Sequence, residues 1–288
     1  MTPKSIRRST VVLLATLVVA GCQDPDKARE EIQSLDSLNV IDENNLNNIL
    51  LDFADPEQAV VYFQSSLAKE PDRLEFKQGY AQSLARAGRL EEAVLAYQSI
   101  EATGELTNTD RLSYTEALIQ TGEWEKGKAQ LAAIPPTVET YDRYRLEAIV
   151  SDFQKSWDRS DAYYEQAREL TTRPAAIFNN WGISKAARGD RPAAEEMFTR
   201  AISFDSSLFS AKNNLAISRA TRKVYELPIV PMSKQEEAEL LHNIALQAIR
   251  NGDVDIGRGL LEEAVETHPQ FFSEATAKLE ALDRNVAR

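Results

Sequence analysis

The sequence predicts an all-α fold built from stacked helical hairpins, and three observations carry this prediction. The composition favours helices, because Ala, Leu, Glu, Gln and Arg are abundant while aromatic residues make up 8% and glycines number 11 in 288 residues. Matching residues recur 34 positions apart, as in the pairs Gly88/Gly122 and Asn180/Asn214. Within each period, a small residue is followed one helical turn later by a bulky one.

A period of 34 residues is typical of tetratricopeptide repeats, helix–turn–helix units that stack on copies of themselves. The chain is therefore predicted to form a tetratricopeptide-repeat superhelix, or solenoid, with a C-terminal capping helix. Small residues are expected where the two helices of a unit approach closely, at Ala59, Ala81, Ala93, Gly182, Ala194, Ala216 and Ala245. Bulky residues are expected to fill the space between them, at Phe63, Tyr97, Phe198 and Leu261.

We divide the chain into a signal segment at 1–21, a tether at 22–38 and a repeat domain at 39–288. The tether is polar and acidic, and is either flexible or a short helix. The repeat domain is predicted to hold seven units, at Val40–Asp72, Arg73–Leu106, Thr107–Thr140, Tyr141–Pro174, Ala175–Leu208, Phe209–Met232 and Ser233–Phe271. The fourth unit lacks the usual glycine turn, and Trp157 is expected in its place.

The sixth unit is predicted to lack its second helix. Pro228, Pro231 and β-branched neighbours disfavour a helix over 223–232, so we expect an extended strap there. Asn243 follows Asn214 by only 29 residues, which independently indicates a truncated unit. The strap either covers core that the missing helix leaves open or binds a partner.

Two further helix boundaries are visible in the sequence. Ser233, followed three residues later by Glu236, has the pattern of a capping box and predicts the start of a new helix. After Pro269, the segment FFSEATAKLEAL is amphipathic and is expected to form the helix that caps the end of the stack.

The N-terminus resembles a bacterial lipoprotein signal. A basic start precedes an apolar run at 11–19 that is too short to span a bilayer. The run ends in Val-Ala-Gly-Cys at 19–22, which has the form of a lipobox. Cys22, the only cysteine, is therefore the predicted first residue of the mature protein and the carrier of its lipid anchor. The alternative is an ordinary secretory signal in which Cys22 is incidental.

The residues after Cys22 and the overall charge indicate where the protein acts. Gln23, rather than aspartate, follows the cysteine, which favours the periplasmic face of the outer membrane over retention in the inner membrane. The formal net charge of -12 argues against a nucleic-acid partner. A single cysteine permits no internal disulfide, so stability must come from packing.

No catalytic or metal-binding pattern is found. The segment 122–128 resembles a phosphate-binding loop, but Ala129 stands where Ser or Thr is needed and no strand precedes it. His242 and His268 are the only histidines and lack the spacing of metal ligands. We therefore expect no enzyme activity, no cofactor and no metal. The three tryptophans are expected to be core or turn residues, at Trp124, Trp157 and Trp181.

Partner binding is expected on the concave wall of the superhelix, which the first helix of each unit lines. By repeat register the inward positions are Asn44, Asn48, Gln78, Gln82, Arg86, Leu112, Glu116, Arg145, Ile149, Asn179, Ile183, Asn213, Ile217, His242 and Leu246. Amide side chains can pair with the backbone of an extended peptide, and the scarcity of lysines argues against a clamp for a C-terminal carboxylate. The candidate binding site is centred on Asn179, Ile183, Asn213, Ile217, His242 and Leu246. About half of the inward positions are expected merely to be solvated.

The lipoprotein signal followed by repeat units ending in KNNLAIS and ELLHNIALQAIRNGDVDIGRGLLEEA resembles the TadD family of tight-adherence (Flp) pilus assembly. The resemblance implies that Cys22 is the anchor and that the later repeats bind a secretin or another assembly partner. It also implies a pilotin-like role, in which the protein helps a secretin ring to reach or assemble in the outer membrane. The alternative is a scaffold lipoprotein for outer-membrane protein assembly or for the regulation of cell-wall enzymes.

Overall fold

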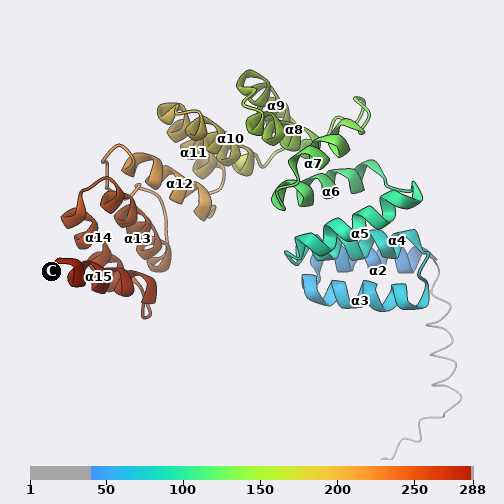
Figure 1. Ribbon diagram of the computed structural model, residues 1–288, viewed down its shortest axis with the longest axis horizontal. Coiled ribbons are helices and arrows are strands. Elements are labelled where there is room, and N and C mark those ends of the chain that lie inside the picture. The colour runs from blue at the N-terminus through green and yellow to red at the C-terminus, as the bar shows by residue number, and fades with distance from the viewer. Residues whose placement is uncertain (1–39, 287–288) are drawn as a thin grey trace, which may run out of the picture. The chain divides into compact units, whose positions relative to one another are not determined.

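The computed structural model describes residues 40–286, which form fourteen α-helices and no β-strand within that range (Figure 1). The all-α prediction is therefore confirmed. The chain divides into two compact units, one ending at Asp55 and the other beginning at Pro56. The predicted signal segment at 1–21, Cys22 and the rest of the predicted tether at 22–38 lie outside the described residues.

The compact unit that ends at Asp55 contains helix α2 (Val40–Phe53). The compact unit that begins at Pro56 opens with α3 (Pro56–Lys69) and continues as helical hairpins. Four regular hairpins are formed by α4 (Leu74–Arg86) with α5 (Leu90–Thr103), α6 (Asn108–Gln120) with α7 (Trp124–Ala132), α8 (Tyr141–Phe153) with α9 (Trp157–Glu169), and α10 (Ala175–Ala187) with α11 (Arg191–Phe204). The chain then contains α12 (Phe209–Ala220), the hairpin of α13 (Lys234–Arg250) with α14 (Val254–Thr267), and α15 (Ser273–Val286), which packs on α14.

The small residues predicted at the helix contacts are buried as expected. The six alanines of that set are fully buried. At Gly182 of α10, an added Cβ would lie 2.5 Å from the ring of Phe198 on α11, so only glycine fits beneath that ring. The four bulky residues of the prediction are also buried, which confirms the small-and-bulky pattern as the packing rule of the hairpins.

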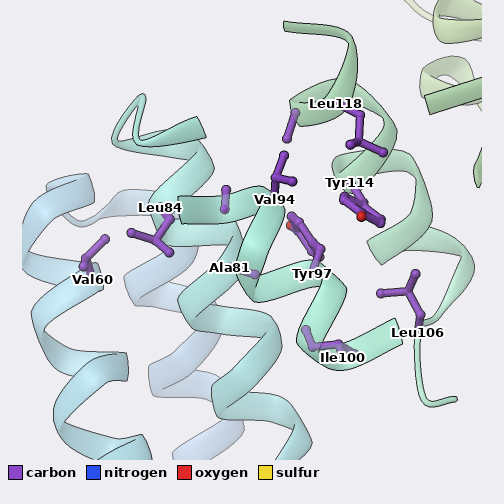
Figure 2. Close-up of a cluster of buried hydrophobic side chains, with 11 residues drawn as sticks. Val60, Ala81, Leu84, Val94, Tyr97, Ile100, Leu106, Tyr114 and Leu118 are labelled. Carbon is purple, nitrogen blue, oxygen red and sulfur yellow. The ribbon is translucent and has the colours of Figure 1, made fainter. Parts of the chain in front are cut away.

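Each second helix packs on two first helices, its own and the next one along the chain. In Figure 2, Tyr97 of α5 lies beside Tyr114 of α6, and their ring centroids are 5.6 Å apart. The same cluster reaches back through Leu84 of α4 to Val60 of α3. Burial of each large side chain contributes about 1.5–3 kcal/mol, so contacts between neighbouring units hold the stack together.

The first helices end in a common turn with one residue in the left-handed region. The residue after it donates its backbone N–H to the carbonyl five positions back, as Asp190 does to Lys185 at 2.9 Å. The left-handed residue is a glycine at 88, 122, 189 and 252 but a lysine at 155 and 223. The expectation for the fourth unit was therefore wrong: Lys155 occupies the turn, and Trp157 begins α9.

The predicted strap at 223–232 contains neither helix nor strand and lies within a non-helical segment at 221–233. Leu227 contacts both the cluster shared by α12 and α13 and the cluster around α14 and α15. Tyr225 packs on the first of these clusters, and its hydroxyl donates a hydrogen bond to Asp253 at the start of α14. Pro228 is buried, whereas Ile229 is fully exposed. The strap therefore covers part of the core beside α12.

The end of the strap is fixed by a capping box and a buried cation. The predicted capping box is confirmed, because Ser233 accepts from the N–H of Glu236 and the Glu236 carboxylate accepts from the N–H of Ser233. The same carboxylate pairs with Lys212 of α12 at 2.9 Å, and the Lys212 side chain is only 2% exposed. This ion pair joins the start of α13 directly to α12.

Candidate functional site

The six residues at the centre of the predicted site lie on three successive first helices. They are Asn179 and Ile183 on α10, Asn213 and Ile217 on α12, and His242 and Leu246 on α13. Ile183 is 48% exposed, and the side chains on α12 and α13 are half-buried. Asn179 is only 7% exposed, so the expectation that it faces an open groove was wrong.

The asparagines join neighbouring helices to each other. Asn214 donates a side-chain hydrogen bond to the Oδ1 of Asn179 at 3.0 Å, which links α12 to α10. Asn243 donates to the Oδ1 of Asn213 at 2.8 Å, which links α13 to α12. The amides expected to pair with a partner's backbone therefore already pair within the chain. Losing them would weaken the stack itself.

The same arrangement continues along the earlier first helices. Gln78 of α4 donates to Asp110 of α6 at 2.7 Å, and Arg145 of α8 pairs with Glu116 of α6 at 2.8 Å. Leu112, also expected on the inward face, is buried in the core. These polar positions, assigned to partner binding, thus hold adjacent first helices in register. The exposed apolar side chains are the better candidates for a binding surface.

An apolar pocket of about 280 Å³ opens between α8 and α10, beside the start of α7. We call this cavity the first-helix pocket. Its apolar walls are formed by Trp124, Ile149, Phe153, Ile183 and Ala187. The rings of Trp124 and Phe153 are stacked with centroids 4.1 Å apart and an interplanar angle of 1°. Phe153 and Ile183 are both largely exposed, so apolar surface remains open to a partner at this position.

The polar lining of the first-helix pocket includes a hydrogen-bonded centre at Asp152. The carboxylate of Asp152 accepts hydrogen bonds from Ser160 at 2.5 Å, from Ser184 at 2.6 Å and from Tyr164 at 2.9 Å. Burial and the adjacent Asp152 carboxylate raise the pKa of Tyr164, so its hydroxyl stays protonated and keeps donating. Because these bonds join α8, α9 and α10, they set the separation of the pocket walls.

A second polar centre holds α10 against α9. Asp161 accepts from Trp181 at 2.5 Å, from Lys185 at 2.9 Å and from Arg188 at 2.8 Å. Burial alone would raise the pKa of Asp161, but the hydrogen bonds from Arg188, Lys185 and Trp181 hold it below its usual range. The carboxylate is therefore charged at neutral pH, and it fixes the helix that presents Ile183.

The structure brings together some predicted residues and adds others. Ile149 and Ile183, both predicted, face the same pocket, whereas Trp124 was expected in the core or a turn and instead forms a wall. Phe153 was missed, although it lies one helical turn after Ile149 and hence on the same helical face. That spacing was a signal available in the sequence.

No group of three or more His, Cys, Asp or Glu side chains within residues 40–286 is placed to hold a metal ion. His242 and His268 both contact the Phe272 ring, with centroids 5.3 Å and 4.7 Å away. No helix in the same range is long and apolar enough to cross a membrane.

The chain resembles known tetratricopeptide-repeat proteins in sequence and in fold. Residues 50–104 match the tetratricopeptide repeat family. The APC/C hetero-tetramer Cut9–Hcn1 shares the fold with a TM-score of 0.61 at 12% identity, over 87% of this chain and 51% of that chain. The chain thus spans about half the length of that relative.

Two further solved structures have the same fold. The human IFIT1 dimer with PPP-AAAA aligns with a TM-score of 0.61 at 14% identity, over 89% of this chain and 68% of the other. A tetratricopeptide repeat protein from Parabacteroides merdae aligns with a TM-score of 0.54 at 14% identity, over 82% and 95%. Comparison with curated proteins gives no significant sequence match. At these identities the likeness establishes the fold alone.

Proposed function

We propose that this protein is an adaptor that binds a segment of a partner protein in the first-helix pocket. Tetratricopeptide repeats support a protein-interaction scaffold. The observation that carries the proposal is the open apolar pocket formed by Trp124, Phe153 and Ile183, whose walls are positioned by a satisfied hydrogen-bond network. Such a pocket suits a bulky apolar side chain, which contributes about 1.5–3 kcal/mol on burial.

We further propose that the adaptor is lipid-anchored at Cys22 and acts on the periplasmic face of the outer membrane. The lipobox at 19–22 and Gln23 support this placement. The resemblance to the TadD family supports a secretin of a tight-adherence pilus, or another component of that machine, as the partner. Its function is then pilotin-like: it brings the secretin to the membrane in which the ring assembles.

The binding proposal is tested by changing the most exposed wall of the pocket. Ile183→Asp places a charge at the centre of the apolar surface, and we expect it to reduce capture of the secretin more than tenfold. Leu170→Asp is the matched control, because Leu170 is likewise 48% exposed and lies at the C-cap of α9, a second helix. Capture is measured with full-length protein and purified secretin, alongside a thermal melt. Equal capture by both variants and the wild type would remove the pocket from the binding site.

The cellular proposal is tested by replacing the anchor. Cys22→Ser should release the protein from the membrane fraction and reduce the amount of multimeric secretin in the outer membrane. Unchanged membrane association would contradict the anchor. If the anchor is lost and secretin assembly continues while other outer-membrane proteins or cell-wall enzymes are impaired, the scaffold function replaces the pilotin-like one.

A further inference from the structure

A second, larger crevice lies between the strap and α14, on helices that take no part in the first-helix pocket. Its volume is about 750 Å³. The strap contributes Tyr225 and Leu227, and α14 contributes Ile256 and Leu260. Ile256 is 48% exposed, the same fraction as Ile183 in the first-helix pocket. The crevice therefore presents apolar surface that the described chain leaves open.

The repeat register explains why the crevice is wide. The equivalent face of α5 forms a pocket of about 450 Å³ together with Leu67 of α3 and Pro71, which follows α3. In that case the preceding second helix, α3, is complete and comes before α4 and α5 in the chain. Before α14, the second helix of the sixth unit is missing and the strap takes its place. An extended segment is thinner than a helix, so it leaves more of the α14 face uncovered.

Gly259 is a second, independent feature of this face. It lies in the middle of α14, where glycine weakens a helix, and a Cβ added there would meet no other atom within 4 Å. The neighbouring Gly257 differs, because its added Cβ would lie 2.5 Å from Ile249. Gly259 shares the helical face of Ile256 and Leu260 by its spacing. Packing within the described chain does not require a glycine at 259, whereas close approach of another helix does.

The charges around the crevice indicate the chemistry of its occupant. Glu226 on the strap and Glu263 on α14 line it and are exposed. The remaining charged pair, Lys223 with Asp253 at 3.0 Å, is internally neutralised. The rim is therefore net negative and favours a basic partner. A second copy of this chain, with a formal net charge of -12, is a poor match.

We propose that this crevice binds a basic amphipathic helix from a partner protein. The apolar face of the helix packs on Ile256, Gly259 and Leu260, and its basic residues lie against Glu226 and Glu263. A helix satisfies its own backbone hydrogen bonds, so it can lie on an apolar wall without leaving unpaired amides. This site is independent of the first-helix pocket, and it does not rest on the proposed function.

The probe is a fluorescently labelled 14-residue Leu/Lys peptide with an amphipathic helical pattern, titrated into the full-length protein and followed by anisotropy. We expect saturable binding that weakens with added salt. Ile256→Asn should weaken it at least tenfold, whereas Leu170→Asn, at an equally exposed leucine that caps the end of α9 and lines neither pocket, should leave it unchanged. Equal effects of the two substitutions, or equal binding of a scrambled Leu/Lys peptide, would overturn the proposal.

Two further variants test the geometry and the charge. Gly259→Ala should raise the melting temperature of the free protein, because alanine favours the helix, and yet weaken peptide binding; Gly259→Leu should abolish binding without unfolding the chain. Glu263→Lys should weaken binding of the Leu/Lys peptide and strengthen binding of a Leu/Glu peptide. Unimpaired binding by Gly259→Leu would show that no helix packs there. Self-association of the chain that Ile256→Asn disrupts, without peptide binding, would identify a second copy as the occupant and overturn the proposal.

Discussion

The fifth and sixth units begin alike and end differently. Both first helices contain two adjacent asparagines, and both end in a left-handed turn, at Gly189 and at Lys223. After Gly189, Asp190 caps a new helix, and its proline falls in the first turn, where a missing N–H costs nothing. A helix begun at the same distance after Lys223 would hold Pro228 and Pro231 in its interior, where each removes a hydrogen bond and clashes with the preceding turn.

Comparison of the fifth and sixth units shows which parts of a unit the stack requires. The first helix is retained in both units. Asparagine pairs join α10 to α12 and, across the missing helix, α12 to α13. The second helix can be replaced, provided that other contacts cover the core and fix the next helix. In the sixth unit, Leu227 supplies part of the cover, and the Lys212–Glu236 pair positions α13.

The largest expected effect comes from breaking the contact that substitutes for the missing helix. Glu236→Ala leaves the charge of Lys212 buried and unpaired, which should lower the free energy of unfolding by about 3 kcal/mol. Urea denaturation measures this change. The double variant Lys212→Met, Glu236→Gln should recover most of the loss, because it removes both charges.

A control on the same helix separates burial from charge. Glu237 pairs with Lys234 at 2.7 Å, but the Lys234 side chain is 71% exposed, so Glu237→Ala should change stability by less than about 1 kcal/mol. Equal losses for Glu236→Ala and Glu237→Ala would show that the buried pair has no special part in holding the sixth unit.

The next prediction concerns the close helix contact of the fifth unit. Gly182→Ala places a Cβ against the Phe198 ring and should cost about 1–3 kcal/mol through overpacking. The sixth unit already has alanine at the matching position, Ala216, which packs in the cluster that includes strap residues. Combining Gly182→Ala with Phe198→Leu should relieve part of the cost in denaturation experiments. If Gly182→Ala leaves the free energy of unfolding unchanged, the complete hairpin of the fifth unit is packed no more tightly at this position than the sixth unit is with its strap.

A third prediction uses the one ionisable member of the asparagine series. By repeat register, His242 of the seventh unit takes the place that Asn179 and Asn213 hold in the fifth and sixth. Burial lowers the pKa of His242; the hydrogen bond with Asn243 and the charge of Glu274 on α15 oppose the shift, while Lys278 on α15 adds to it. Protonation therefore favours the unfolded chain.

Stability should accordingly be constant above the ordinary histidine pKa of about 6.5 and fall as the pH drops below it towards the lower folded-state pKa. Melts between pH 7.5 and 5.5 measure this dependence. His242→Asn, which restores the residue of the other units, should reduce the slope. If wild type and variant lose stability equally over that window, His242 is not the group that titrates.

The smallest effect is expected at the turns. Lys155 and Lys223 have φ values of 57° and 65°, in the left-handed region that disfavours residues with a Cβ. Lys155→Gly should raise stability by about 0.5–1 kcal/mol. Lys223→Gly should gain less, because it also removes the ion pair with Asp253. Conversely, Gly189→Lys should destabilise the fifth unit. Thermal melts should rank the melting temperatures in the descending order Lys155→Gly, Lys223→Gly, Gly189→Lys, and a different order would contradict the shared turn geometry.

Patterns with local causes were readable from the sequence. The small-and-bulky pairs and the capping box at Ser233 were predicted, because each depends on residues one helical turn apart. The 34-residue spacing was visible because this local pattern recurs in successive units. Pro228 and Pro231, together with their β-branched neighbours, predicted the absence of a helix from the strap. Lys155 escaped notice, because nothing in its side chain marks a left-handed turn in the way that a glycine does.

What the tertiary structure decided was which of the inward residues remain free. The sequence placed Asn179 and Ile183 on the same inward face, but only the rotation and separation of adjacent helices determine that Asn179 pairs with Asn214 while Ile183 stays open. The stacking of Trp124 on Phe153 likewise joins residues from two different hairpins. Spacing along a chain determines the face of a helix, whereas contact across helices depends on how they pack.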